Sequence, residues 1–444
     1  MTRIFPAFAY GNGPVEGCFW AGTVPDDAVD FPAASGDLRA DVVIIGAGFT
    51  GMSAALHRAQ DGVDVVVLDA MHPGWGASGR NGGFCCLGGA KASSGDIASR
   101  FGADALKGWR RAEQDAVALV QDILQTHAIT ADTHSQGETI LAHNLRTARE
   151  LEGEVARVQA EYGVEARWHN SEDLDSLGMA GPFKGGLTIP VGFALNPRKY
   201  IAGLVRAVRG FGGRIHGQSP VTSIVQDGSG IEVRTARATI RARRLILATN
   251  GYSSDDLPPW MAGRYMPAQS NVLVTRPLTQ TELDAAGWTS RQMAYDTRNL
   301  LHYFRLMPDN RFLFGMRGGL VASPRAEAAI TARARRHFEA MFPAWREVET
   351  PHSWSGMVCF SANLVPYCGP IPDLPGAFAG FAFHGNGVAM GSYTGALLAD
   401  LVQGKQTRLP HPAVMQAHAP RFPLGRFRRA LLPAGYALAG LRDL

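Results

Sequence analysis

Residues 40–69 read ADVVIIGAGFTGMSAALHRAQDGVDVVVLD, and this stretch decides the fold of the N-terminal part of the chain. An apolar segment runs into the turn GAGFTG, a helix of small residues follows, and a second apolar segment ends at Asp69. In such a turn Gly46 permits the tight bend, Gly48 lets the backbone approach a pyrophosphate, and Gly51 lets the helix lie close to the strand. Asp69 stands where a carboxylate accepts hydrogen bonds from ribose hydroxyls. The strand, helix, strand and acid together predict a dinucleotide-binding βαβ unit.

The composition is that of an ordinary globular chain. It has 444 residues, 46% of them hydrophobic, and a formal net charge of +4, which suggests two or three domains and gives no case for nucleic acid. Five cysteines form no spaced framework, as in proteins of a reducing cytoplasm. We find no signal-peptide pattern, no apolar run that would span a membrane and no histidine spacing typical of zinc. We therefore expect a cytoplasmic protein without a metal site, a membrane contact or a nucleic-acid partner.

The rest of the chain alternates between helical and strand-like stretches. Residues 98–160 recur at helical spacing and predict mainly helix. Short alternating segments follow, and the buried segment 245–250 ends on a turn, which indicates a return to the sheet that begins at residue 40. Residues 265–320 are rich in strands, with a hairpin turn at 308–310. No low-complexity linker separates these stretches, so we expect interleaved domains.

Three further segments decide which dinucleotide is bound. They are GWGASGRNGG at 74–83, ATNGY at 248–252 and FAFHGNGVAMG at 381–391. At these residues the chain resembles the glycine/D-amino acid oxidase (DAO) family of FAD enzymes, and the GASGRNGG loop most resembles the bacterial gamma-glutamylputrescine oxidase-like branch. The resemblance extends from about Trp20 to residues 422–425. An NAD(P) dehydrogenase would leave these loops without a role.

The resemblance implies an α/β architecture. A Rossmann-like FAD-binding domain of the glutathione reductase/p-hydroxybenzoate hydroxylase type is expected to interleave with an α+β substrate domain built on an antiparallel sheet. The expected segments are an N-terminal extension at 1–39, an FAD-binding domain at 40–95, 185–255 and 352–410, a substrate domain at 96–184 and 256–351, and a C-terminal tail at 411–444.

The resemblance also implies FAD, held without a covalent bond, as the cofactor. Arg80 and Asn81 are expected beside the flavin, where Ser78 and Asn81 can donate hydrogen bonds to phosphate or flavin edges. The backbone of Val221 is expected to face the adenine. A helix that begins after Val388 would point its positive end at the flavin N1–C2=O edge, where negative charge gathers on reduction. The full set of expected cofactor residues is Gly46, Gly48, Phe49, Thr50, Gly51, Asp69, Ala70, Ser78, Gly79, Arg80, Asn81, Gly82, Gly83, Val221, Thr249, Asn250, Gly251, Gly385, Asn386, Gly387 and Val388.

Members of this family oxidise a C–N bond of an amine or amino acid. The resemblance implies that hydride moves from the substrate α-carbon to flavin N5, that an imine is formed, and that O2 reoxidises the flavin to give H2O2. Two alternatives remain open: a dehydrogenase that passes electrons to another acceptor, and a flavoprotein subunit that needs a partner chain.

The substrate pocket is expected over the flavin, on the strand-rich stretch. Tyr303 and Arg305 alternate on one face of a strand, and Arg317 follows the next strand. Arginine suits a carboxylate because its planar fork binds two oxygens at once. His384 is the fourth candidate catalytic residue. The alternatives are a solvated sheet face for Tyr303, Arg305 and Arg317, and a packing role for His384.

Some positions depart from the family pattern. Sarcosine oxidases place a lysine over the flavin, whereas this chain reads Leu313 there, and none of its five lysines is an obvious replacement. Cys85 and Cys86 could form a strained redox pair but are expected to pack as small buried residues. Cys359 does not match the spacing of relatives that bind flavin covalently. The basic amphipathic tail is expected to dock on its own protein and not on a membrane surface.

Overall fold

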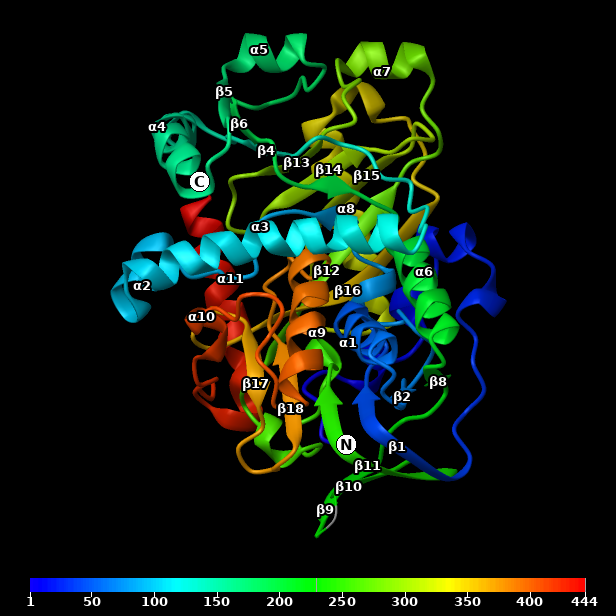
Figure 1. Cartoon of the computed structure of the whole chain (residues 1–444). Helices are drawn as coiled ribbons and strands as arrows, with labels where there is room; N and C mark the ends of the chain where they lie inside the picture. The colour runs from blue at the N-terminus through cyan, green and yellow to red at the C-terminus, as the bar shows by residue number, and fades with distance from the viewer. Residues whose placement is uncertain (229, 444) are drawn as a thin grey trace.

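The computed structural model describes residues 1–228 and 230–443. Within them, two eight-stranded sheets form two halves, the first in the lower part of Figure 1 and the second in the upper part. A separate ribbon pairs β3 (Phe84–Cys85) with β7 (Phe193–Ala194). The helix α3 (Ala103–Thr126) crosses the molecule between the two halves (Figure 1).

The first sheet has the parallel core of a dinucleotide-binding fold. β1 (Gly36–Ile45) pairs in parallel with β2 (Val65–Leu68) on one side and with β11 (Ala238–Leu247) on the other. The chain therefore returns at β11 to the strand where it began, as residues 245–250 predicted. The outer strands are β8 (Arg214–His216) beside β2, β18 (Ala377–Phe381) and β17 (Tyr367–Pro370) beyond β11, and the hairpin of β9 (Ser223–Asp227) and β10 (Gly230–Arg234), which pairs with β11.

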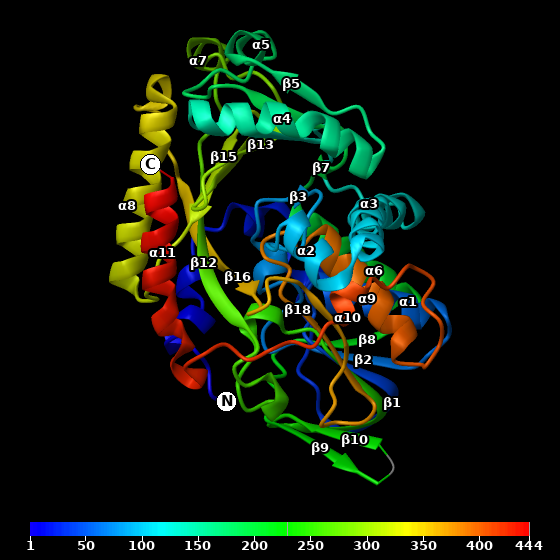
Figure 2. The ribbon, with the colours of Figure 1, turned by 90° about the vertical axis from the view of Figure 1, so that its left-hand side faces the viewer.

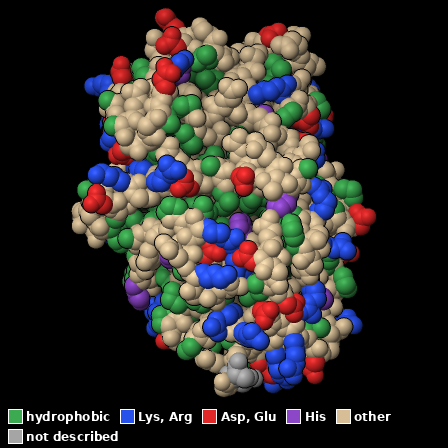
Figure 3. Space-filling model, in the orientation of Figure 1, with side chains coloured by type: hydrophobic (Ala, Val, Ile, Leu, Met, Phe, Trp, Pro, Cys, Tyr) green, Lys and Arg blue, Asp and Glu red, His purple; other side chains and the backbone are tan. Residues whose placement is uncertain are grey.

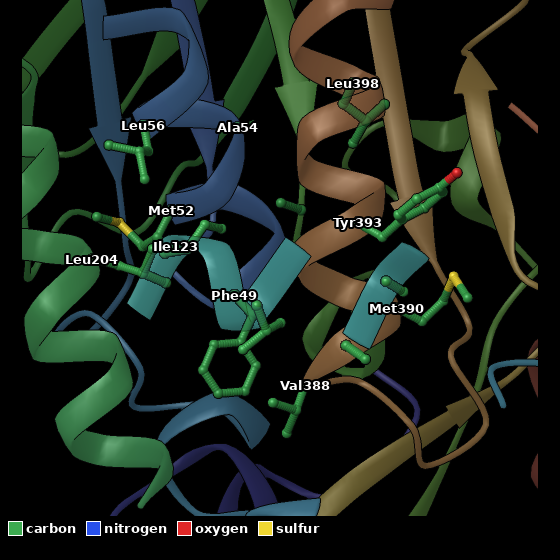
Figure 4. Packing of buried hydrophobic residues seen from close by; sticks show 14 of the residues in the cluster. Phe49, Met52, Ala54, Leu56, Ile123, Leu204, Val388, Met390, Tyr393 and Leu398 are labelled. Atoms are coloured by element: carbon green, nitrogen blue, oxygen red, sulfur yellow. The ribbon is translucent and has the colours of Figure 1, made fainter. Parts of the chain in front are cut away.

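Helices cover one face of this sheet. α1 (Phe49–Gln60) packs against α9 (Ala389–Leu401) and α6 (Pro197–Gly210), and α3 packs on α9. Figure 4 shows their apolar side chains meeting in one cluster. The two central helices come close because Gly395 on α9 lacks a side chain: a Cβ there would lie 2.4 Å from Thr50 O. The packing thus fixes the start of α1, where the glycine-rich turn ends.

The second sheet is antiparallel except for one parallel pair, β13 with β4. Along β14, Phe304 packs against α8 (Pro324–Met341), whereas Tyr303 lies on the opposite face. That opposite face is turned toward the first half, so the alternation predicted for this strand is confirmed. In order across the sheet the strands are β16 (His352–Phe360), β12 (Met266–Val274), β15 (Phe312–Arg317), β14 (His302–Leu306), β13 (Met293–Asp296), β4 (Glu138–Leu141), β6 (Gly186–Ile189) and β5 (Arg167–His169).

Four elements differ from the sequence prediction. β4 interrupts the stretch expected to be mainly helical, and both β6 and β16, assigned to the FAD-binding segments, pair in the second sheet. The helix α3, assigned to the substrate domain, packs on α9 of the first half. Short apolar segments show that a strand exists, but the sheet that it joins depends on pairing with distant residues.

The tail contacts its own chain. Arg428 is fully buried, and its Nη2 lies 2.7 Å from Asp255 Oδ1. At the other end of the last helix, the Asp443 carboxylate accepts hydrogen bonds from the backbone N–H groups of Asn299 and Leu300. This helix (red in Figure 2) is therefore held at both ends. The remaining helices are α2 (Ser94–Phe101), α4 (Leu145–Tyr162), α5 (Ser171–Ser176), α7 (Gln280–Ala286), α10 (Ala413–Gln416) and α11 (Leu431–Arg442).

The surface is mixed in charge. Figure 3 shows acidic and basic side chains interspersed over one face, in keeping with the small net charge. Across residues 1–228 and 230–443, no helix is both long enough and apolar enough to cross a bilayer.

Candidate active site

A cavity of about 720 Å³ lies between the first sheet and the second. Its walls include the turn after β1, the loop that follows β2, the turn after β11 and the loop before α9. The second sheet contributes side chains from β12, β13, β14 and β15. The glycine-rich segments singled out in the sequence are thus brought together around one space.

The turn after β1 is shaped for close backbone contacts. Gly46 has a φ of +101°, and a Cβ there would lie 2.7 Å from Ala248 O. A Cβ on Gly51 would lie 1.8 Å from Gly46 O, so the helix touches the turn as predicted. Gly48 lines the cavity, and a Cβ there would meet Ser78 Oγ at 2.8 Å. A side chain at any of these positions would collide with neighbouring protein atoms, so the three glycines permit the shape of the turn that borders the cavity.

Asp69 lies at the end of β2 and lines the cavity, and its contact with ribose hydroxyls stays a prediction. Its Oδ2 accepts a hydrogen bond of 2.8 Å from Ala47 N, and its Oδ1 accepts one of 2.9 Å from Met71 N. Burial raises the pKa of Asp69 to about 6, although the two backbone hydrogen bonds oppose this shift. The carboxylate therefore fixes the turn as well as facing the cavity.

In the loop 76–83 the amide of Asn81 donates within the loop and not to a ligand, whereas donation by the Ser78 hydroxyl to a phosphate stays a prediction. Asn81 Nδ2 donates to Ala77 O and Ser78 O, and its Oδ1 accepts from Gly83 N. Ser78 Oγ accepts a hydrogen bond of 2.9 Å from Phe49 N. Both side chains face the cavity, but their hydrogen bonds shape the loop and the start of α1.

Arg80 keeps one atom free for a ligand. Its Nε donates to Trp75 O at 3.0 Å and its Nη1 to Ser355 O at 3.1 Å. Its Nη2 is buried and has no hydrogen-bond partner in the described part of the chain. The residue is 3% exposed and lines the cavity. A buried donor without a partner is costly, so this atom points to a polar ligand in the cavity.

The expected cofactor residues line the cavity with four exceptions: Gly51, Gly79, Gly83 and Gly251. A Cβ on Gly79 would lie 2.4 Å from Gly74 O, and one on Gly83 would lie 2.0 Å from Leu195 O, so these two glycines permit close backbone contacts behind the wall. Asn386 lines the cavity, but its amide donates to Leu87 O.

The substrate side of the cavity carries Tyr303 and Arg317. The Tyr303 hydroxyl lies 3.0 Å from Ser270 Oγ, and the ring fits between Gly82 and Gly315, where a Cβ would come within 2.7 Å and 2.1 Å of it. Arg317 donates a long hydrogen bond to His384 O, and among the described residues it has no acidic partner. Burial lowers the pKa of Arg317.

The structure corrects the prediction for Arg305. This side chain is 1% exposed and does not line the cavity. Its Nε donates to Gly82 O at 3.0 Å, its Nη2 donates to Leu195 O at 2.8 Å, and its Nη1 lies 2.9 Å from His134 Nε2. All three nitrogens are occupied, so Arg305 ties the loop 76–83 to the second sheet and does not bind substrate.

His384 is also held by main-chain groups. Its Nδ1 lies 2.8 Å from Gly89 O and its Nε2 accepts from Ser361 N at 3.3 Å. Burial lowers the pKa of His384 to about 4, so the ring is neutral at pH 7 with its proton on Nδ1. The packing alternative is therefore the better description, although the residue borders the cavity.

Other cavity residues had no motif to reveal them. Ser270 and Tyr295 line the cavity from strands β12 and β13. The alternation of side chains along these strands did not show which face borders the cavity. Lys91 also lines the cavity, near Arg317, and is one of the five lysines dismissed from the sequence. Leu313 is fully buried away from the cavity.

The three regions of the cavity fit FAD: a glycine cradle at the turn, an acid at the end of β2, and an unpartnered guanidinium nitrogen in the loop.

The family model "FAD dependent oxidoreductase" (DAO) matches residues 41–401. Probable oxidoreductase OrdL of Rhizobium meliloti is 31% identical over 430 residues, which cover 96% of this chain and 97% of that protein. Gamma-glutamylputrescine oxidoreductase of Escherichia coli is 29% identical over 417 residues, which cover 93% and 95%.

A solved structure agrees on the fold. Glycine oxidase from Geobacillus kaustophilus superposes with a TM-score of 0.70 at 19% identity and covers 86% of this chain and 100% of that one. These matches confirm the resemblance found in the sequence, the fold class and the FAD cofactor. The chain belongs to the DAO family of FAD-dependent oxidoreductases.

Proposed function

We propose that this enzyme oxidises a C–N bond in a small amine or amino acid that carries a carboxylate. The observation behind the proposal is Arg317, a desolvated cation at the cavity with no acidic partner among the described residues. A carboxylate would supply the missing charge, because the guanidinium fork binds two oxygens at once. Lys91 adds a second cation nearby. The chain's similarity to a gamma-glutamylputrescine oxidoreductase and to a glycine oxidase supports the same chemistry.

The chain's own residues orient the substrate and keep water out. Arg317 anchors the carboxylate, and the Tyr303 hydroxyl with Ser270 Oγ offers a polar contact at the same wall. His384 acts as a neutral support for the loop before α9. Bound FAD would supply the two-electron oxidation of the C–N bond, with an imine that hydrolyses as the product and, where O2 is the acceptor, H2O2. No acid–base triad is required for this.

We propose that the FAD is held without a covalent bond. Cys359 lines the cavity, but burial raises the pKa of its thiol to about 12. The thiolate is the reactive form, so this thiol is a poor nucleophile at neutral pH.

The test is anaerobic reduction of the purified holoenzyme by a panel of sarcosine, glycine, D-alanine and gamma-glutamylputrescine. At least one of these amines should bleach the flavin absorbance, and air should restore it with formation of peroxide. Denaturation followed by filtration should then release the yellow colour from the chain. If none of the amines bleaches the flavin, the proposal of amine oxidation is wrong.

Bleaching without recovery in air would favour a dehydrogenase that uses another acceptor. The sequence argument for this alternative, the lack of a lysine at position 313, is not supported by the structure, because Leu313 lies away from the cavity whereas Lys91 lines it. Recovery in air would instead remove the need for a partner chain or another acceptor.

Replacing Arg317 with leucine is expected to raise KM for a carboxylate-bearing substrate about 100-fold, because charge-assisted hydrogen bonds contribute on the order of 1.5–3 kcal/mol each and about 1.4 kcal/mol is tenfold in affinity. Arg317→Lys should lose less, since it keeps the charge but not the fork. Steady-state kinetics with a matched pair of amines, one with the carboxylate and one without, measures the effect. An equal rise in KM for both amines would contradict the assigned role.

A further inference from the structure

Glu138 is a buried carboxyl that the proposed function does not use. It lies on β4 and is 2% exposed. Its Oε2 has no hydrogen-bond partner among the described residues, and no lysine, arginine or histidine of that part of the chain forms an ion pair with it. Burying a carboxylate without a partner lowers the stability of the folded state, so a carboxyl at such a position calls for an explanation.

Register places Glu138 beside the cavity. On β13, Met293 is the partner of Glu138, and Tyr295, two residues further on, is the partner of Tyr303. Side chains two residues apart share a face of a sheet, so Glu138, Tyr295 and Tyr303 lie on the face turned to the cavity. Tyr295 lines that cavity, and its hydroxyl adjoins the Glu138 carboxyl. Tyr295 therefore stands between the buried carboxyl and the substrate.

The remaining groups around Glu138 offer no cation. The Cys86 thiol adjoins it from the loop and accepts from Asn386 Nδ2 at 3.4 Å. From α3 and α4 come Glu113 and Tyr162, and the cation beside Glu113, Arg110, is already paired with Glu113 and Glu161. Desolvation, which outweighs every other influence, raises the pKa of Glu138 to about 8.

We propose that Tyr295 and Glu138 form a relay that removes a proton from the substrate ammonium, with Tyr295 in contact with the substrate and Glu138 as the positioned acceptor behind it. The proposal rests on the proposed function, because amine oxidation needs a free electron pair on nitrogen, which an ammonium lacks. It extends that function by assigning two residues to this step and by requiring that the substrate arrives as a cation.

The step balances without a further reactant. An N–H bond of the ammonium breaks and its proton passes to the Tyr295 oxygen, while the Tyr295 hydroxyl proton passes to a Glu138 oxygen. Tyr295 ends neutral as it began, Glu138 becomes the neutral acid, and the electron pair of the broken bond stays on nitrogen. No group is oxidised or reduced, and Glu138 later returns its proton to solvent or to the departing product.

The relay predicts a specific pH profile. At saturating substrate, the rate of anaerobic flavin reduction by the panel amine that bleaches fastest should rise with pH through about 8, as Glu138 ionises. Glu138→Gln should lower the rate at pH 8 by roughly 100-fold and remove this rise, and Glu138→Asp should restore part of it. Tyr295→Phe should lower the rate to a similar extent. The increase in rate with pH could also come from ionisation of the substrate ammonium. Two amines of different pKa distinguish these origins, because an increase caused by the substrate would shift with the pKa of the amine.

Stability gives a second readout that does not need activity. The folded-state pKa of Glu138 is above its unfolded value of 4.5, so the folded state holds the extra proton between about pH 5 and 8 and loses stability as pH rises through that window. Glu138→Gln cannot ionise, so its melting temperature should match the wild type near pH 5 and exceed it near pH 9. Glu152→Gln, which removes an exposed carboxyl on α4, should keep the wild-type dependence of melting temperature on pH.

The outcomes separate the two proposals. If no panel amine bleaches the flavin, the proposed function fails. The comparison of melting temperatures between pH 5 and pH 9 still decides whether Glu138 ionises in that range. The relay is overturned if an amine bleaches the wild type and Glu138→Gln with the same pH profile. It is also overturned if the melting temperatures of the two proteins do not diverge between pH 5 and pH 9.

Discussion

Gly51→Val is expected to yield a colourless protein that does not retain FAD and that unfolds at a lower temperature. The reason is a contact with the backbone and not with a side chain: the added Cβ would lie 1.8 Å from Gly46 O and 3.0 Å from Gly46 C. If the contacted atom belonged to a flexible side chain, that side chain could rotate away. Here the contacted atoms are backbone, so the turn itself would have to move. That turn is the predicted phosphate cradle, so we expect the loss of space to become a loss of cofactor affinity.

Flavin absorbance per chain after desalting, together with thermal unfolding with and without added FAD, measures this effect. Gly108→Ala is the matched control, because Gly108 is also helical and a Cβ there would meet nothing within 4 Å. The control should keep its colour and gain up to about 1 kcal/mol from the higher helix propensity of alanine. A yellow Gly51→Val protein with wild-type affinity for FAD would show that the turn is not the cradle.

Arg305→Met should have the largest effect on stability among the arginine variants. The guanidinium donates to Gly82 O and Leu195 O and contacts His134 Nε2, and methionine leaves these acceptors buried without partners. Each such acceptor costs on the order of 1–3 kcal/mol, so a loss of at least about 3 kcal/mol in unfolding free energy is expected. Because Gly82 lines the cavity in the loop 76–83, which is expected beside the flavin, FAD affinity should fall as well.

Denaturant unfolding of the apoprotein and FAD titration test this prediction separately. Arg111→Met is the control, since that side chain is 72% exposed and pairs only with Asp115 one helical turn away. Removing such an exposed pair should change stability by less than about 1 kcal/mol. Equal losses in the two variants would refute the proposed clamp. The fraction of Arg305→Met that still binds FAD should show a substrate KM near the wild-type value, in contrast to Arg317→Leu.

The sequence carried enough information for the nucleotide end of the site. Gly46, Gly48 and Gly51 have roles that depend on residues within one turn, and a strand, a helix and an acid follow in order. Local chemistry fixes such a unit, so the glycine contacts and the position of Asp69 could be predicted. The resemblance to the DAO family then supplied the cofactor and the class of fold.

The substrate end depended on distant pairing. Alternation placed Tyr303 and Arg305 on one face correctly, but only the structure shows that carbonyls of residues 82 and 195 occupy Arg305 while Arg317 has no acidic partner. β4 lay unrecognised between two helices because it is four residues long, and Glu138 was missed with it. A helical pattern on either side outweighed the short run of Thr139 and Ile140.

The way in which the two sheets share the chain bears on how this enzyme is made. The first nucleotide-binding strand and helix leave the ribosome early, yet β11 and α9, which complete their packing, are translated far later. Until then the nascent chain exposes the apolar face of α1, with the strand edge of β1 unpaired on one side. Such late closure slows folding and leaves the growing polypeptide open to aggregation, so its production in cells should depend on chaperones that shield it during synthesis.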